Sequence, residues 1–452
     1  MRQSVRMETC DVVVVGLGPG GEYVAGELAK AGLDVVGVDE RLVGGECPYY
    51  GCVPTKMMIA AATTLHEGSR IARMAGSAQV QPSWEPVATR IRDEATDDWD
   101  DTVAVKRLED AGARFVRGRG VITAPGQVTV DGTTYAARRG IVLNTGTAPS
   151  APPIEGLADV DYWTNRDIVR LTELPRSIIV IGGGPIGCEM AQVLAQFGVE
   201  VTVVEVADRL VAVEEPEASE IIEKAFTDLG MHVVTGAKIE RVGKDADGFV
   251  VELPDRALRA ERLLVAAGRR NNLAGLGLDQ VGLDAEPRVL EPDERMRVAD
   301  GVWAIGDITG KGAFTHMSMY QGAVVVRDLL GKDGPWADYR AVSRVTFTGP
   351  EIGSVGMTEA AARDHGIDVR VATGDMGTRG WIAAEPGLVK LVADGARGIL
   401  VGGTAVGPSG GEVLSMITTA VHAEIPIATL ADMHFAYPTF HRGLQPVLQQ
   451  LL

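Results

Sequence analysis

Two stretches of the chain share one order of apolar and glycine positions. Each begins with an uninterrupted run of β-branched residues, Val12–Val15 in the first and Ile178–Ile181 in the second. A glycine-rich turn, a helical stretch, a closing glycine and a second β-branched run follow in both copies. A strand, a glycine turn, a helix and a second strand in this order predict a β–α–β unit. The sequence therefore predicts two such units, 166 residues apart.

The glycine turns have the spacing that dinucleotide-binding units need. The glycines are Gly16, Gly18 and Gly21 in the first copy and Gly182, Gly184 and Gly187 in the second. The first of each set allows a tight turn, the second lets the backbone approach a pyrophosphate, and the third lets the helix pack closely on the strand. An acidic residue that can accept a hydrogen bond from a ribose ends each unit, Asp39 and Glu205. Two such sites predict two cofactors that exchange electrons, for which FAD and NAD(P)H are the natural pair.

Further strand signals divide the rest of the chain. The apolar runs that end at Gly146, Gly268 and Gly306 each predict a strand followed by a turn. A stretch with Pro149, Pro152 and Pro153 predicts a linker. After about residue 335 no further glycine turn of this kind occurs. Runs there, residues 344–348 and 398–406, are typical of strands in an α+β domain.

Composition and charge exclude several classes of protein. A chain of 452 residues that is 46% hydrophobic predicts two to four globular domains. Its net charge of −18 would repel phosphate backbones, so nucleic acid is not an expected partner. Neither a membrane-spanning apolar run nor a signal-peptide pattern is found, and four cysteines do not make a disulfide scaffold. The expected compartment is the cytoplasm.

Two cysteines lie in a short glycine-rich segment after the first β–α–β unit. Cys47 and Cys52 are five residues apart, just before a helical stretch at residues 57–65, so they could form a disulfide. At the start of a helix the dipole would stabilise the thiolate of Cys52. Two inert buried thiols are the alternative, whereas a zinc site would need a second matching pair. The other two, Cys10 and Cys188, are expected to be small buried hydrophobes.

With this segment the chain resembles the flavin-dependent pyridine nucleotide–disulfide oxidoreductases, the family of dihydrolipoamide dehydrogenase, glutathione reductase and mercuric reductase. The family motif GGxCxxxGCxPxK is matched by residues 44–56, and further motifs are matched over residues 182–189, 266–269, 306–307 and 347–356. The resemblance covers essentially the whole chain. It implies an α/β fold with two Rossmann-like dinucleotide-binding domains and a C-terminal α+β dimerisation domain. The implied boundaries are 1–150 and 270–335 for the FAD domain, 151–269 for the NAD(P) domain and 336–452 for the interface of a homodimer.

The resemblance also implies roles for single residues. Cys52 would be the charge-transfer sulfur next to the flavin, Cys47 the interchange sulfur, and Lys56 and Glu189 an ion pair near flavin N5 and the nicotinamide. The FAD contacts would be Gly16, Gly18, Gly21, Asp39, Gly45, Lys56, Gly146, Asp307, Thr315 and His316. The NAD contacts would be Gly182, Gly184, Gly187, Glu205 and Gly268. A solvated lysine, a surface acid and a helix-cap histidine in the core are the alternatives for Lys56, Glu189 and His316.

Two features bear on the choice of coenzyme and acceptor. Glu205 favours NADH, because a carboxylate repels a 2′-phosphate, although the nearby Arg209 leaves NADPH open.

Near the C-terminus the family's His-Pro-Thr-x-x-Glu motif is altered, with Tyr437 in place of the acid–base histidine and Arg442 in place of the glutamate. A phenol with a pKa of about 10 cannot replace an imidazole near neutral pH. His441, four residues on, could share a helix face with Tyr437 and act as the base, or it could be a surface histidine.

The sequence therefore predicts an FAD-dependent NAD(P)H oxidoreductase with a redox-active Cys47–Cys52 disulfide. Electrons from NADH would pass through FAD to a disulfide or to a small acceptor such as a quinone, or a dithiol would be oxidised in reverse. Dihydrolipoamide dehydrogenase with an atypical base and a flavoprotein redox sensor without turnover are the alternatives. Mercuric reductase is disfavoured, because residues 444–452 contain no cysteine pair.

Overall fold

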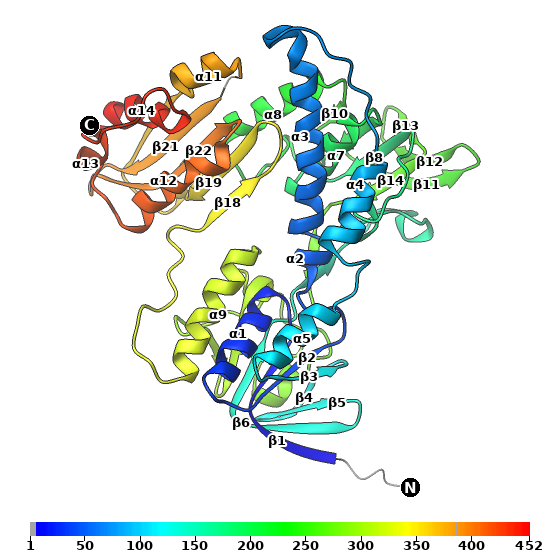
Figure 1. Cartoon of the computed structure of the whole chain (residues 1–452), viewed down its shortest axis with the longest axis vertical. Helices are drawn as coiled ribbons and strands as arrows, with labels where there is room; N and C mark the ends of the chain where they lie inside the picture. Colours follow the sequence, from blue (N-terminus) through cyan, green and yellow to red (C-terminus); the bar gives the residue numbers. More distant parts are fainter. Residues whose placement is uncertain (1–5, 386) are drawn as a thin grey trace. The chain divides into compact units, whose positions relative to one another are not determined.

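The computed structural model describes residues 6–385 and 387–452, and the chain forms two compact units (Figure 1). Unit 1 contains the described residues of Met1–Pro54, Thr89–Pro149 and Arg269–Asp338, and unit 2 those of Thr55–Ala88, Ser150–Gly268 and Tyr339–Leu452. Each unit holds one of the two β–α–β repeats.

Unit 1 is built on an eight-stranded sheet in which the first β–α–β unit is central. The strands are β1 (Arg6–Val15), β2 (Val35–Asp39), β3 (Arg114–Arg117), β4 (Val121–Ala124), β5 (Gln127–Val130), β6 (Thr133–Leu143), β16 (Arg297–Ala299) and β17 (Val302–Ala304). Their order is β16-β17-β6-β1-β2-β3, and β5 and β4 continue the sheet from β6. β1 runs parallel to both β2 and β6, and β6 runs parallel to β17. This is the predicted parallel, dinucleotide-binding type of sheet.

The apolar run in β1 is continuous because each face of the sheet has its own core. Val12 and Val14 lie in a core with residues of α1 (Pro19–Lys30) and α9 (Thr315–Leu329). Val13 and Val15 lie in a second core with residues of β5, β6 and the short helix η3 (Leu278–Val281). A strand that is buried on both faces has no polar side, which explains the lack of alternation.

The parallel strands bring three predicted turns to one edge of the sheet. Gly16, Gly146 and Gly306 follow the carboxyl ends of β1, β6 and β17, which is the edge where α/β sheets bind ligands.

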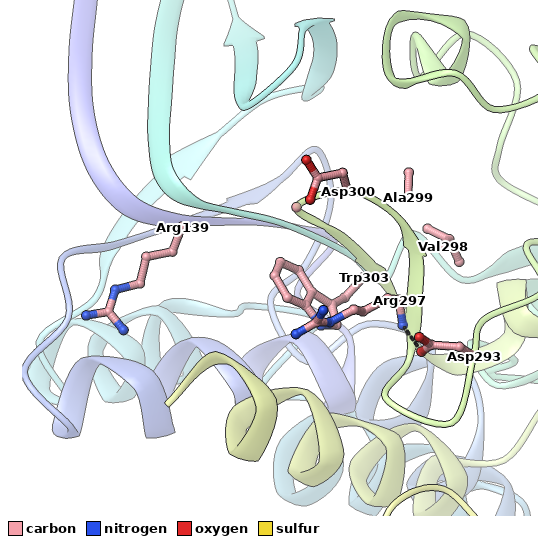
Figure 2. A pocket seen from close by; sticks show the side chains of 8 residues that line it. Arg139, Asp293, Arg297, Val298, Ala299, Asp300 and Trp303 are labelled. Carbon is pink, nitrogen blue, oxygen red and sulfur yellow. Dashed lines mark hydrogen bonds between the residues drawn. The ribbon is translucent and has the colours of Figure 1, made fainter. Parts of the chain in front are cut away.

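A separate pocket of about 450 Å³ lies at the opposite, amino end of β17 (Figure 2). It is lined by Arg139, Asp293, Arg297, Val298, Ala299, Asp300, Gly301 and Trp303. None of these is among the predicted site residues.

Unit 2 contains the second repeat in a four-stranded parallel sheet of order β10-β9-β8-β14. Its elements are β8 (Ser177–Ile181), α7 (Pro185–Gln196), β9 (Glu200–Val204), α8 (Pro216–Asp228), β10 (His232–Val234) and β14 (Arg262–Val265). A three-stranded antiparallel sheet is inserted between β10 and β14, from β11 (Arg241–Asp245), β12 (Gly248–Glu252) and β13 (Ala257–Ala260). The short helices η2 (Leu157–Asp159) and α6 (Asn165–Ile168) precede β8.

The C-terminal part of unit 2 is a five-stranded antiparallel sheet of order β18-β19-β22-β21-β20. The strands are β18 (Ser343–Thr346), β19 (Glu351–Gly356), β20 (Val369–Gly374), β21 (Leu388–Asp394) and β22 (Ile399–Gly407). The helices are α10 (Glu359–Asp364), α11 (Gly377–Ala383), α12 (Gly410–His422), α13 (Ile427–Ala431), η5 (Phe440–Gly443) and α14 (Leu444–Gln450). α12 packs on β19 and β22, and α14 packs on β20 and β21. The predicted α/β fold with a C-terminal α+β part is therefore confirmed.

Residues 55–88 are grouped differently from the boundaries expected from the sequence, which include them in the FAD domain. Most of this segment belongs to α3 (Cys52–Met74), which is longer than the helix expected at residues 57–65. The indole of Trp84 donates to the carbonyl of Leu171 (2.8 Å) and packs edge-on against Phe197. Arg70 binds Glu385 (2.6 Å). These contacts place the segment in unit 2.

The proline-rich stretch after Gly146 is partly a strand. β7 (Thr147–Pro149) pairs with β15 (Arg269–Asn271), and both belong to unit 1. β7 lies in a two-stranded sheet and is therefore an edge strand, where the missing N–H of Pro149 is tolerated. The predicted linker therefore begins only after residue 149.

Candidate active site

The first glycine turn has the close packing that its glycines predict. Gly16 has φ +91°, and a Cβ there would overlap the backbone carbonyl of Asn144. A Cβ at Gly21 would overlap the carbonyl oxygen of Gly16. A carboxylate oxygen of Asp39 accepts from the backbone N–H of Leu17 (2.7 Å), and burial raises the pKa of this carboxyl group. Only glycine therefore fits at the first and third positions of this turn.

The second turn repeats this construction at the matching positions. Gly182 has φ +112°, and a Cβ at Gly187 would overlap its carbonyl oxygen. The carboxylate of Glu205 accepts from the backbone N–H of Gly183. A Cβ at Gly184 would meet no described atom within 4 Å, so the middle glycine faces open space. Open space at this position is what a pyrophosphate needs in order to approach the backbone.

Both turns lead into helices whose N-termini fit an anion. α1 and α7 each have twelve residues, a proline in the first turn and a glycine N-cap without a side-chain hydrogen bond. The N–H groups of the first turn then point away from the helix, and the helix dipole favours a negative charge there. The residues present therefore fit the pyrophosphate of one dinucleotide in each unit.

The cysteine segment lies beside the first glycine turn. A Cβ at Gly45 would come within 2.8 Å of the Cα of Gly18. Cys47 is in the short helix α2 (Glu46–Tyr49), which begins directly after Gly45, and Cys52 is the first residue of α3. The segment that contains the two cysteines therefore starts next to the sheet edge where the first dinucleotide would bind.

Cys47 and Cys52 form a pair of free thiols at the start of α9. Cys47 is half-buried and Cys52 is exposed. The Sγ atom of Cys52 lies 3.4 Å from the Oγ1 atom of Thr315. A hydrogen bond with Cys52, followed by burial, raises the pKa of Cys47 well above its usual range. Since Cys10 and Cys188 are fully buried, their expected role as small hydrophobes is confirmed.

A polar chain joins the Gly306–Asp307 turn to the cysteine segment. The hydroxyl of Thr147 donates to Asp307 (2.7 Å), and the guanidinium of Arg269 donates to the same hydroxyl (2.7 Å). Arg269 also pairs with Glu46 (3.3 Å), the residue before Cys47. No sequence pattern indicates Thr147 or Glu46, because their partners are more than 100 residues away.

Lys56 and Glu189 form the ion pair that the resemblance implied. Nζ of Lys56 lies 2.8 Å from Oε2 of Glu189, and the other carboxylate oxygen accepts from the backbone N–H of Phe347 (2.8 Å). The ammonium also lies 4.6 Å from the centre of the Phe347 ring. The side chain of Glu189 is only 6% exposed, so the alternative of a surface acid is wrong. His316 is exposed and stacks on Phe314, so the alternative of a core histidine is wrong as well.

Tyr437 and His441 are not on one helix face, contrary to the expectation. Tyr437 lies in a turn, and the first helical residue after it is Phe440. The phenol is exposed and reaches the hydroxyl of Thr378 at 3.5 Å. The ring of His441 is half-buried, and its Nε2 lies 3.4 Å from the hydroxyl of Thr439. Pro438 and the turn around it interrupt the helical spacing between Tyr437 and His441.

The profile of the family described as pyridine nucleotide-disulphide oxidoreductase matches residues 10–322. The chain belongs to this family. Its dimerisation-domain profile matches residues 342–447, which supports a homodimer. The members are FAD-dependent oxidoreductase enzymes, and FAD and NAD(P)H are their cofactors. Among the described residues, no helix is both long and apolar enough to cross a membrane, and no group of three His, Cys, Asp or Glu residues could hold a metal ion.

Similar proteins carry several different activities. A dihydrolipoyl dehydrogenase of Thermus scotoductus is 31% identical over 466 residues, 98% of each chain. A mercuric reductase of Streptomyces lividans is 32% identical over 97% of this chain and 95% of its own. Among solved structures, LpdA of Mycobacterium tuberculosis has a TM-score of 0.86 at 26% identity, covering 98% of this chain and all of its own. A Cu(II) complex of the flavoprotein disulfide reductase RclA from Escherichia coli has a TM-score of 0.85 at 26% identity, covering 97% and 99%.

Proposed function

We propose that the chain is an NADH-dependent flavoenzyme that passes electrons to a small acceptor such as a quinone and reduces lipoyl disulfides only slowly. The observation that carries this proposal is Tyr437, which takes the place of the family's acid–base histidine. Its side chain is 66% exposed, and its hydroxyl reaches Thr378 only at 3.5 Å. FAD, when bound, supplies the centre that takes up a hydride from NADH and delivers electrons to the cysteine pair or to an acceptor.

The proposed FAD site uses residues of unit 1. These would be Gly16, Gly18, Gly21, Asp39, Gly45, Gly146, Asp307, Thr315 and His316. Asp39 would accept from the adenosine ribose, and the first turn of α1 would bind the pyrophosphate. Thr147 and Arg269 would hold Asp307 in place. Gly182, Gly184, Gly187, Glu205 and Gly268 of unit 2 would hold NADH in the same way.

Lys56 would supply a fixed positive charge to the same reaction. Glu189, which is buried and accepts from the backbone of Phe347, restrains the ammonium in one position. A preorganised charge stabilises developing negative charge without reorganisation, which is the largest contribution to many enzyme rates. This is our basis for assigning Lys56 and Glu189 to the catalytic group.

The cysteine pair is poorly equipped for exchange with disulfide substrates. Thiol–disulfide exchange needs a thiolate, and the pKa of Cys47 is raised by its hydrogen bond to Cys52 and by burial. An imidazole would remove the proton of Cys47 near neutral pH, but a phenol does not. Reduction of a quinone needs no acid–base group for a thiol. The alteration at Tyr437 should therefore slow quinone reduction less than it slows disulfide exchange.

Restoring the family motif should create activity toward lipoamide. We expect Tyr437→His combined with Arg442→Glu to increase NADH-dependent lipoamide reduction about 100-fold, the usual contribution of a general acid–base. Turnover with a quinone should change less than about twofold, because that reaction does not use the imidazole. Steady-state NADH oxidation with each acceptor measures both effects.

Two control variants separate the alternatives. Tyr437→Phe, which adds no base, should leave both activities unchanged. His441→Ala should do the same, and loss of lipoamide reduction in this variant would favour dihydrolipoamide dehydrogenase with His441 as the base.

Wild-type protein that reduces lipoamide as fast as a quinone would contradict the proposal. Flavin reduction without turnover on any acceptor would favour the redox sensor. Because similar proteins include a mercuric reductase and a copper complex of RclA, Hg(II) and Cu(II) should be among the acceptors that are assayed.

NADH should be preferred over NADPH by about 100-fold in kcat/KM, because like charges cost several kcal/mol when they meet at a binding site. The carboxylate of Glu205 would face the 2′ position of the ribose. Arg209 does not offset it, since its guanidinium donates to the carbonyls of Glu214 (2.9 Å) and Ala212 (2.7 Å). Kinetics with both coenzymes measure the ratio, and Glu205→Gln should reduce it about tenfold. Equal use of the two coenzymes by the wild type would refute this assignment.

A further inference from the structure

Three consecutive residues near the cysteine segment have an unusual backbone. Asp97, Asp98 and Trp99 have φ values of 48°, 54° and 59°, in the left-handed region. Aspartate tolerates this region, but a bulky residue such as tryptophan rarely adopts it. Backbone of this kind persists only where surrounding contacts fix it, and it occurs preferentially at functional sites. The contacts of Trp99 therefore indicate which part of the structure this turn supports.

The turn is a built structure and not a frayed end. It follows a short π-helix, η1 (Ile91–Ala95). The buried hydroxyl of Thr96 donates to the carbonyls of Ile91 (3.0 Å) and Arg92 (3.2 Å). The backbone N–H of Asp98 donates to the carbonyl of Arg92 (2.7 Å). These bonds hold the left-handed residues in one conformation, and this conformation fixes the direction of the Trp99 indole.

Trp99 holds the loop between the two cysteines. Its indole N–H donates to the backbone carbonyl of Tyr49 (3.0 Å), two residues after Cys47 and three before Cys52. The phenol of Tyr49 is buried and donates to the carbonyl of Asp100 at 3.4 Å. The same segment therefore binds the cysteine loop through both the backbone and the side chain of one residue.

A second attachment lies on the other side of Cys47. The carboxylate of Asp101 accepts from the backbone N–H of Val43 (2.7 Å) in a buried hydrogen bond. Arg117 pairs with this carboxylate at 2.6 Å. Residues 97–101 thus contact the chain four residues before Cys47 and two residues after it.

We propose that Trp99 is a positioning residue for the redox pair, which keeps Cys47 within bonding reach of Cys52 and so favours the disulfide over the dithiol. The inference rests on the proposed redox role of these cysteines. Closing a disulfide requires a narrow range of Cβ and sulfur positions, so a loop already held near them loses less entropy on closure. When the S–S bond forms, two thiols release two protons and two electrons. In a dithiothreitol buffer, oxidised dithiothreitol takes up both as its own S–S bond opens.

The test is the disulfide equilibrium of the flavin-bound protein in anaerobic mixtures of reduced and oxidised dithiothreitol. Free thiols are alkylated, and the peptides that contain Cys47 and Cys52 are quantified by mass spectrometry. We expect Trp99→Phe, which keeps a packed ring but loses the N–H, to lower the equilibrium constant for the disulfide about fivefold. This corresponds to about 20 mV for a two-electron couple.

Trp84→Phe is the matched control, since the indole of Trp84 also donates to a backbone carbonyl, that of Leu171, and both residues belong to unit 2. Its equilibrium should equal that of the wild type. Equal constants for the two variants would overturn the proposal. A wild type that forms no Cys47–Cys52 disulfide in any mixture would instead refute the proposed function. Should Trp99→Phe fail to fold, Tyr49→Phe should shift the equilibrium less but in the same direction, and no shift would overturn the proposal.

Discussion

Gly21→Ala should yield a protein without flavin, whereas Gly187→Ala should keep the flavin but no longer reduce it with NADH. The two substitutions are the same change at matching positions of the two repeats. In each, the added Cβ would overlap the carbonyl oxygen of the first glycine of its own turn, Gly16 or Gly182. The helix must then move away from the strand, which displaces the N–H groups that would bind the pyrophosphate. Because each turn would bind one cofactor in the proposed arrangement, the two losses should be separate.

Flavin content per chain and the rate of anaerobic flavin reduction by NADH measure the two losses. Gly243→Ala is a suitable control, because a Cβ there would meet no described atom within 4 Å and its backbone is not left-handed. This variant should match the wild type in both measurements. Loss of flavin in Gly187→Ala with retention in Gly21→Ala would exchange the two cofactor assignments. Retention of both functions in both variants would refute the dinucleotide sites.

The sequence predicted the two glycine turns and the acids that end each repeat, because their physics is local. The strand, glycine turn, helix and closing acid lie within 28 residues in each repeat, and each position has its own steric or hydrogen-bonding reason. The hydrogen bonds from Leu17 to Asp39 and from Gly183 to Glu205 arise within single repeats. The ion pair of Lys56 and Glu189 spans 133 residues, and only the family resemblance indicated it.

The features that the sequence did not predict depend on contacts between distant segments. Nothing near Trp99 in the sequence indicates that its indole binds Tyr49, 50 residues away. The grouping of residues 55–88 with unit 2 depends on the contacts of Trp84 and Arg70 with segments far along the chain. The helical spacing assumed for Tyr437 and His441 failed because periodicity says little across a proline-containing turn.

Cys52→Ser should halve the number of electrons that the protein accepts from NADH. In the wild type, the flavin and the Cys47–Cys52 disulfide together should take up about two equivalents of NADH per chain, because each is a two-electron couple. With serine at position 52 no disulfide can form, so only the flavin remains and uptake should fall to about one equivalent. Cys10→Ser is the matched control, since Cys10 is fully buried in unit 1 and has no proposed role.

Anaerobic NADH titration of the oxidised protein, followed by its visible spectrum, tests the central claim that the two cofactors and the two sulfurs form one electron path. The account predicts a yellow protein that takes up about two equivalents in the wild type and in Cys10→Ser, and about one in Cys47→Ser and Cys52→Ser. A long-wavelength band should also appear in Cys47→Ser, where the remaining sulfur of Cys52 would lie next to the flavin. A colourless protein, or equal uptake by all four proteins, would contradict the account.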